Sequence, residues 1–163
     1  MGKREVRRTK QRLAVLECTA ALLSDKEPEA IKMTEIALQV GVSIGGLYRY
    51  YPSKEAIFQA LQMQALDQLQ ESLERSIADD ITVHGGYTWS LISTLFNGWS
   101  AFEAHSPSRA LLLHRFAWRN EALLSPDEQT AIGQRVFEII SVMSLVLETL
   151  TEEKILRPGD HQI

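Results

Sequence analysis

Apolar side chains recur at helical spacing along the whole chain, so the sequence predicts an all-α protein. The most informative stretch, residues 33–54, begins with one apolar helical stripe, formed by Met33, Ile36, Ala37 and Val40. Gly41 is suited to end this helix, because glycine adopts the left-handed conformation without a steric penalty. Ser43 is suited to cap a second short helix, predicted over residues 44–51 and ended by Pro52. The stretch therefore predicts a helix-turn-helix.

The second short helix has an outer face that is hard to explain as scaffold. On a helical wheel its inward side holds Ile44, Leu47 and Tyr51. Its outward side holds two glycines and an arginine, flanked by two tyrosines: Gly45, Gly46, Arg49, Tyr48 and Tyr50. Each glycine weakens a helix interior by roughly 1 kcal/mol relative to alanine, but it allows another molecule to approach the backbone closely. In a helix-turn-helix the molecule that approaches is DNA, whose major groove accepts the second helix.

Five short motifs occur in this region in a fixed order. They are Ile36-Ala37, Gly41-Val42-Ser43, Gly46-Leu47-Tyr48, Tyr50-Tyr51 and Pro52-Ser53-Lys54-Glu55-Ala56. Together they resemble the DNA-binding domain of the TetR family of bacterial transcriptional regulators, over about residues 10–62. The resemblance implies double-stranded operator DNA as a partner, contacted by Thr34, Ser43, Ile44, Gly45, Gly46, Tyr48, Arg49, Tyr50 and Lys54. Two residues depart from the family pattern: Glu27 replaces a usual glycine, and Lys32 replaces a usual Ser or Thr cap, so Thr34 is expected to supply a hydroxyl instead.

Charge is distributed unevenly along the chain, whose net charge is −4. Residues 1–55 hold ten Lys and Arg against seven Asp and Glu, whereas residues 56–163 hold seven against fourteen. A basic front on an acidic body is typical of a DNA-binding protein. Residues 1–12 carry six basic side chains and one acidic one, which form either a frayed, solvated terminus or an arm that contacts phosphates or the minor groove. Lys54, in the first turn of a helix capped by Ser53, is expected to contact a phosphate.

The remaining apolar patterns predict further helices. Their approximate ranges are 13–24 (apolar stripe Leu13, Leu16, Ala20 and Leu23), 54–78, 87–105, 108–124 and 126–155. The long helix 54–78 is expected to link an N-terminal DNA-binding domain, residues 1–55, to a C-terminal helical effector and dimerisation domain, residues 56–163. The polar segment 79–86, which ends in Gly85-Gly86, is expected to be a hinge.

Aromatic residues of the C-terminal region form either an ordinary helical core or the wall of a small-molecule pocket. In the second alternative, which the resemblance supports, an effector would contact Trp99, Phe102, His114, Phe116 and Trp118. The four histidines show no paired ligand spacing, so no metal site is predicted. No phosphate-binding loop or catalytic motif occurs, so neither an enzyme nor a cofactor is expected. The single cysteine, Cys18, is expected to be buried in the first helix and suits a reducing cytoplasm.

The resemblance implies a cytoplasmic, ligand-responsive repressor that binds a palindromic operator as a homodimer, with the effector pulling the long helix. No apolar run approaches the roughly 18 residues of a membrane span. Family members usually continue with two further helices that pair across the dimer, whereas this sequence ends at Ile163. The expected pairing surface is therefore helix 126–155, including Phe137, Ile140 and Leu147. The alternative is a truncated TetR-like interaction protein that heterodimerises with, or antagonises, a full-length regulator.

Overall fold

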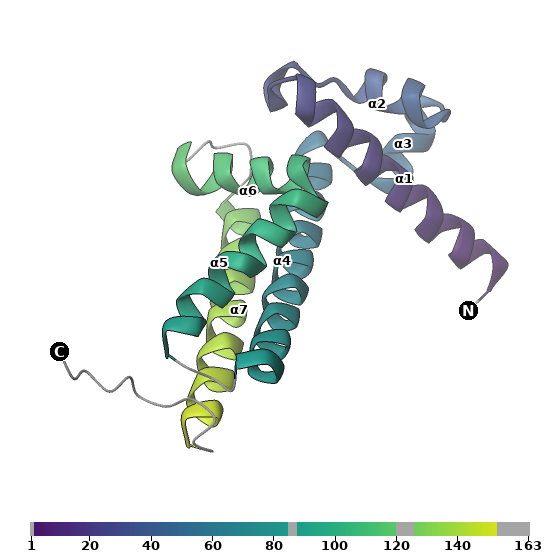
Figure 1. The fold of residues 1–163 in the computed structure, drawn as a ribbon. Helices are drawn as coiled ribbons and strands as arrows, with labels where there is room; N and C mark the ends of the chain where they lie inside the picture. Colours follow the sequence, from purple (N-terminus) through teal and green to yellow (C-terminus); the bar gives the residue numbers. More distant parts are fainter. Residues whose placement is uncertain (1, 85–87, 120–125, 153–163) are drawn as a thin grey trace. The chain divides into compact units, whose positions relative to one another are not determined.

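The computed structural model describes residues 2–84, 88–119 and 126–152, and every element within these ranges is helical. The elements are α1 (Lys3–Asp25), the 3-10 helix η1 (Pro28–Ala30), α2 (Met33–Val40), α3 (Ile44–Tyr50), α4 (Lys54–His84), α5 (Thr88–His105), α6 (Pro107–Arg119) and α7 (Pro126–Glu152) (Figure 1). The predicted all-α class is confirmed. None of the described helices is long and apolar enough to cross a membrane.

The chain divides into two compact units that interleave along the sequence. The first unit comprises residues 1–64 and 108–130, and the second comprises residues 65–107 and 131–163. Helix α4 contributes to both units, and nearly all of α6 belongs to the first. The functional division into domains 1–55 and 56–163 stays a prediction.

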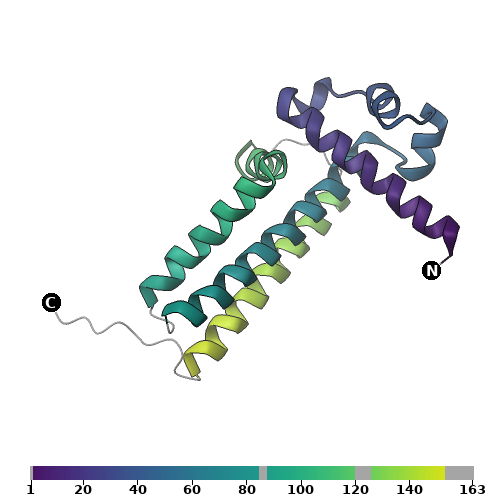
Figure 2. The same cartoon turned by 45° about the vertical axis from the view of Figure 1, so that its right-hand side comes forward.

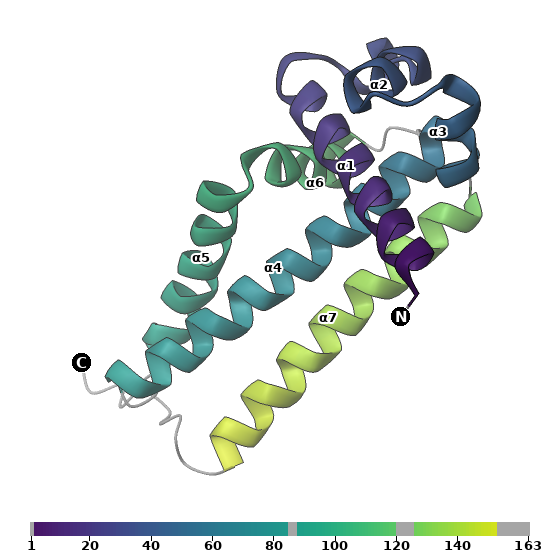
Figure 3. The ribbon, with the colours of Figure 1, turned by 90° about the vertical axis from the view of Figure 1, so that its right-hand side faces the viewer.

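The first unit is built around α1, α2 and α3, which group together with the start of α4 (Figure 3). Its core consists of side chains that are almost fully buried, including Val15, Ile36, Leu47, Phe58 and Leu61. Burying each such side chain stabilises the fold by about 1.5–3 kcal/mol. Leu13, which the apolar stripe placed in this core, is instead 46% exposed. Helix α1 also begins at Lys3, so the basic residues near the N-terminus are helical and do not form a frayed terminus, whereas their contact with phosphates or the minor groove stays a prediction.

Helix α6 is attached to the first unit by polar contacts that the sequence did not reveal. The buried Arg109 donates hydrogen bonds to Glu17 of α1 and, over 3.1 Å, to Gln64 of α4. The hydroxyl groups of Ser24 and Ser108 lie 2.6 Å apart. Arg115 forms an ion pair of 3.0 Å with Glu27. These contacts tie α6 to α1 and to the connection that follows α1.

The second unit packs α5 and α7 on either side of residues 65–84 of α4 (Figures 2 and 3). Arg135 of α7 donates hydrogen bonds of 2.7 Å to both Asp67 and Gln70 of α4. On the other side, the Ser72 hydroxyl of α4 donates to the carbonyl oxygen of Gly98 in α5 over 2.9 Å. A Cβ at Gly98 would lie 3.0 Å from the Leu73 Cα, so the two helices approach each other too closely for a larger residue.

We expect Gly98→Ala to destabilise the protein by about 1–3 kcal/mol, because the added methyl group forces α5 away from the backbone of α4. Urea unfolding measures the change. Gly133→Ala on α7 is the matched control, since a Cβ there meets nothing within 4 Å. The control should gain up to about 1 kcal/mol in helix propensity. Equal stability of the two variants would contradict the close contact at Gly98.

Helix α4 is longer than the sequence predicted. It continues to His84 instead of ending near Ala78, so residues 79–84 are helical and do not form the expected polar hinge. Gly85 and Gly86 lie outside the described residues. Residues 79–84 are mostly polar but contain no proline or glycine, so nothing in their backbone chemistry prevents the helix from continuing.

Candidate nucleic-acid interface

The turn between α2 and α3 has the geometry that the sequence predicted. Gly41 adopts the left-handed conformation, with φ of +74°, and its N–H donates to the Leu38 carbonyl oxygen over 3.2 Å. The N–H of Val42 donates to the Ala37 carbonyl oxygen over 3.0 Å, which completes a Schellman motif. Ser43 then caps α3, because its Oγ accepts a 3.0 Å hydrogen bond from the Gly46 N–H.

The orientation of α3 differs from the helical-wheel prediction at two positions. Leu47 and Tyr51 are buried as expected, at 0% and 2% exposure. Ile44, expected to face inward, is 40% exposed, and Gly46, expected to face outward, is buried. The reason is the cap: a Cβ at Gly46 would lie 3.1 Å from the Ser43 Oγ and 3.8 Å from the Val42 Cβ, so the turn itself covers this residue.

The outward face of α3 is therefore formed by Ile44, Gly45, Tyr48 and Arg49, all of which are exposed. A Cβ at Gly45 would meet nothing within 4 Å, so Gly45 is the glycine that leaves open space in front of the helix. On α2, Thr34 is exposed, and Lys32 makes no side-chain cap, as its departure from the family pattern suggested.

Leu38 of α2 is 81% exposed and was not singled out from the sequence. Its exposure could have been predicted, because Leu38 lies outside the apolar stripe of α2.

Arg12 holds the C-terminal end of α3 against α1. Its guanidinium group donates a 3.1 Å hydrogen bond to the Tyr50 carbonyl oxygen and lies 4.5 Å from the centre of the Tyr51 ring. The Tyr51 hydroxyl donates to the Arg12 carbonyl oxygen over 3.4 Å. Burial raises the pKa of Tyr51, while the neighbouring Arg12 acts in the opposite direction. Arg12 thus positions the end of α3, a role that its place in a basic run did not suggest.

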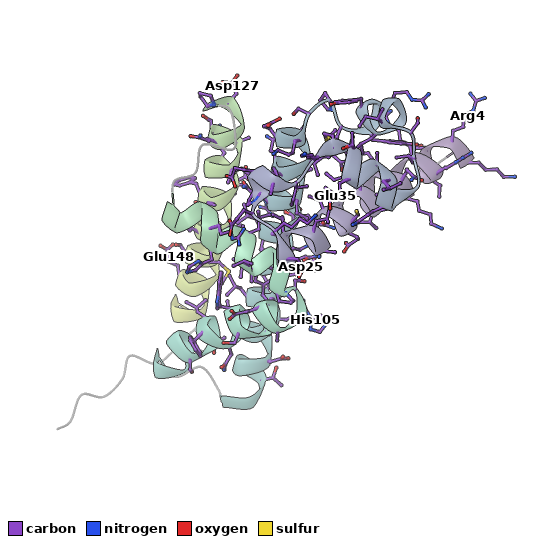
Figure 4. The ribbon with its side chains drawn as sticks, turned by 90° about the horizontal axis from the view of Figure 1, so that it is seen from above. Arg4, Asp25, Glu35, His105, Asp127 and Glu148 are labelled. Carbon is purple, nitrogen blue, oxygen red and sulfur yellow. The ribbon has the colours of Figure 1, made fainter. Side chains whose placement is uncertain are left out.

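The first turns of α1 place three arginines beside the end of α3. Arg4, Arg7 and Arg8 line a shallow pocket of about 450 Å³ together with Arg49 and Tyr50. Figure 4 shows the Arg4 side chain at the outer end of α1, extending away from the helix. Four guanidinium groups around one hollow form a strongly positive surface, which attracts phosphates. The basic composition of residues 1–12 indicated such a surface, but the helical geometry that joins it to Arg49 came from the structure.

Lys54 has partners within the protein that the sequence did not reveal. Its ammonium group donates to the carbonyl oxygens of Pro28, over 3.1 Å, and Glu29, over 3.4 Å. It also lies 5.9 Å from the centre of the Phe58 ring. The expected cap of α4 is confirmed, since the Ser53 Oγ accepts a 3.0 Å hydrogen bond from the Ala56 N–H. Lys54 therefore secures η1 to the start of α4, and its contact with a DNA phosphate stays a prediction.

The residues expected to bind an effector are divided between the two units, and their contact with an effector stays a prediction. In the second unit a pocket of about 330 Å³ lies between α4 and α5, and it is lined by Gln68, Glu71, Ser72, Arg75, Ala101, Phe102, His105 and Ser106. Of the expected residues, Phe102 lines this pocket and Trp99 packs on Phe102, with ring centres 5.9 Å apart. His114 lies on α6 in the first unit. The side chains of Phe116 and Trp118 lie outside the described part of the structure.

Other reactive groups do not form a site within the described residues. No three His, Cys, Asp or Glu side chains there are placed to hold a metal ion. The thiol of Cys18 is half-buried, less than its expected place in the core implies, and donates to Gln39 Oε1 over 3.1 Å. Burial, with a smaller effect from Glu35, raises the pKa of this thiol, which makes it less ready to ionise and react.

Comparison with known sequences identifies the region that carries these features. Residues 15–61 match the sequence model described as bacterial regulatory proteins, tetR family. Over 145 residues the chain is 30% identical to the nucleoid occlusion factor SlmA of Shewanella sediminis, covering 89% of this chain and 68% of that protein. It is 28% identical over 156 residues to the protein of the same name from Aliivibrio fischeri, covering 94% of this chain and 72% of that protein.

Two solved structures have a similar fold. The TetR-family transcriptional regulator PfmR from Thermus thermophilus matches with a TM-score of 0.63 and 20% identity, covering 90% of this chain and 75% of that one. A tetR-family transcriptional regulator from Streptomyces coelicolor matches with a TM-score of 0.59 and 19% identity, covering 98% of this chain and 62% of that one. At these identities the two structures support the fold alone.

Proposed function

We propose a specific function for this chain from the premise that it belongs to the TetR family of bacterial regulatory proteins. As a member of this family it is a DNA-binding transcriptional regulator and not an enzyme. Within that class, we propose that it is a cytoplasmic, ligand-responsive repressor that binds a palindromic operator as a homodimer. The observation that carries this proposal is the open outer face of α3, with Gly45 unobstructed and Arg49 exposed, beside the arginines of α1.

The same surface supports a division of roles among its side chains. Arg4, Arg7 and Arg8 would neutralise phosphates, which gives affinity that depends steeply on salt but not on sequence. The outer face of α3 would enter the major groove, where base edges are recognised. Arg49 is the only long, forked donor on that face, and arginine pairs bidentately with the O6 and N7 atoms of guanine.

An exposed apolar strip on α7 supports the homodimer. Val136, Phe137 and Ile140 are 38%, 70% and 57% exposed, whereas Ile139 and Met143 are buried. Positions 136, 137 and 140 share one face of the helix, because residues three and four apart are neighbours on its surface. Contiguous exposed apolar side chains of this kind mark protein interfaces. We propose that this strip pairs with its copy in a second chain; Leu147, also expected there, lies outside the described side chains.

The continuity of α4 supports the ligand response. One uninterrupted helix, Lys54–His84, contributes residues 54–64 to the DNA-binding unit and residues 65–84 to the second unit. The pocket of about 330 Å³ in the second unit is lined by α4 residues, including Gln68 and Arg75. We propose that an effector bound there moves α4 and thereby releases the DNA.

We expect Arg49→Ala to lower operator affinity by about 1–3 kcal/mol and to relax base preference at one position in each half-site. The measurement begins by selecting bound sequences from a random DNA pool with the wild-type chain, where a palindromic consensus is expected. Gel-shift titrations then compare the variants on single-base changes. Lys26→Ala removes an equal charge from an exposed position after α1, outside the outward face of α3, and should leave base preference unchanged. An equal loss on every sequence would assign Arg49 to phosphate contact instead.

A second candidate function follows from the names of the relatives. Several are nucleoid occlusion factors, so this chain could bind chromosomal DNA in order to act on cell division instead of transcription. Deleting the gene separates the two functions. Altered transcription next to the bound sites, with normally placed division, supports the repressor, whereas division across the nucleoid with unchanged transcription supports the second function.

A further inference from the structure

The outward face of α3 holds one side chain that neither phosphate contact nor hydrogen bonding to bases explains. Ile44 is 40% exposed and adjoins Gly45, in front of which the space is open. Isoleucine has no side-chain donor or acceptor, so it cannot bind a phosphate or a polar base edge. The sequence predicted that Ile44 faces inward. Because it is exposed instead, it lacks the hydrophobic stabilisation that burial in the core would provide.

Among the residues at the start of α3 and on its outward face, Ile44 is the one suited to an apolar contact with DNA. The Ser43 hydroxyl is engaged by the Gly46 N–H, and Leu47 is fully buried in the core. Of the other exposed side chains on α3, Tyr48 ends in a hydroxyl and Arg49 in a guanidinium, so each favours a polar partner. The major groove offers one apolar partner, the C5 methyl group of thymine.

We propose that Ile44 is a specificity-determining residue that contacts a thymine methyl group in each half-site. This inference rests on the proposed operator binding. Along a helix that lies in the groove, Ile44 and Arg49 are about 7.5 Å apart, at about 1.5 Å per residue. That distance corresponds to roughly two base-pair steps of about 3.4 Å. The thymine contacted by Ile44 is therefore expected about two base pairs from the guanine contacted by Arg49.

The test uses the whole chain and an operator selected from random DNA. Each thymine of the operator is replaced in turn by deoxyuridine, which lacks only the methyl group. Burial of one methyl group corresponds to about fourfold in affinity, so we expect about a fourfold loss for one half-site and about 15-fold when both are replaced. Replacement of thymines elsewhere in the operator is expected to leave the affinity unchanged.

Ile44→Ala is the variant that assigns the effect to this side chain. It is expected to bind the thymine operator more weakly and to be insensitive to deoxyuridine at the position where the wild type is sensitive. Ile44→Val keeps part of the apolar contact and should remain sensitive. Because Ile44 is exposed, both variants are expected to melt at the wild-type temperature, which circular dichroism checks.

Two results would overturn the inference, and they differ in what they leave standing. Sequence-selective binding that is insensitive to every methyl deletion, or an Ile44→Ala variant as sensitive as the wild type, removes Ile44 from base recognition but keeps the operator-binding function. Binding without any sequence preference overturns both the inference and the proposed function.

Discussion

Replacing Ile140 by glutamate is expected to make the protein monomeric and to lower operator affinity by about a thousandfold or more. Ile140 and Phe137 are 57% and 70% exposed on α7, at the centre of the proposed pairing surface. A glutamate there would have to lose its hydration on pairing, which is strongly unfavourable for an unpaired charge. A monomer would keep one short recognition helix and the weak phosphate-dominated binding, on the order of 10⁻⁴ to 10⁻⁶ M.

Light scattering at micromolar concentration and gel-shift titration together measure this effect. Thr82→Glu is the matched control, since it adds the same charge to an exposed position of α4, outside the strip on α7. The control should remain dimeric and bind the operator. A wild-type chain that is monomeric and shows no sequence preference would contradict the homodimer, and would favour a TetR-like protein that acts through a partner chain.

Replacing Gly45 by valine is expected to abolish specific DNA binding, with a loss of about a thousandfold, while the fold remains intact. Nothing lies within 4 Å of a Cβ at this position, so the new side chain has room in the free protein. In the complex the same side chain would occupy the space through which the groove approaches the backbone of α3. Thermal unfolding should be unchanged or slightly improved, because glycine is a poor helix former.

Gly46→Val separates close approach to DNA from support of the fold. Its Cβ would lie 3.1 Å from the Ser43 Oγ, so the substitution should disturb the cap of α3 and destabilise the protein by about 0.5–2 kcal/mol. Its loss of DNA binding should therefore follow its loss of stability, unlike that of Gly45→Val. Unchanged operator affinity in Gly45→Val would show that the open space in front of α3 has no role in binding.

The helix-turn-helix was predictable from the sequence because its determinants act locally. The left-handed cap at Gly41 and the serine cap at Ser43 each complete hydrogen bonds within a few residues along the chain. Pro52 likewise limits α3 through its own backbone geometry. Such signals need no knowledge of the rest of the molecule, so the type and order of the elements around residues 33–54 came out correctly.

The exposure of individual residues on α3 was decided by the tertiary structure. A helical wheel assigns each residue to the inward or outward side by its angle alone, as if the core covered one side of the helix along its whole length. Helix α3 has only seven residues, so the capping turn buries Gly46 while Ile44, in the first turn, extends past the core. Ile44 is therefore exposed and Gly46 buried, which is the reverse of the helical-wheel prediction.

The contacts that join distant segments also required the structure. Arg12 of α1 donates to the Tyr50 carbonyl oxygen at the end of α3, and Lys54 of α4 donates to the carbonyl oxygens of Pro28 and Glu29 in η1. Helix α6 joins α1 through Arg109 and Glu17, a pair far apart in the sequence. A charged side chain has many partners of suitable chemistry along the chain, and only the path of the backbone selects one of them. The sequence by itself therefore determined which elements form and which family they belong to, whereas the tertiary structure decided which charged side chains have partners within the protein, as Arg12, Lys54 and Arg109 do, and which stay exposed, as Arg49 does.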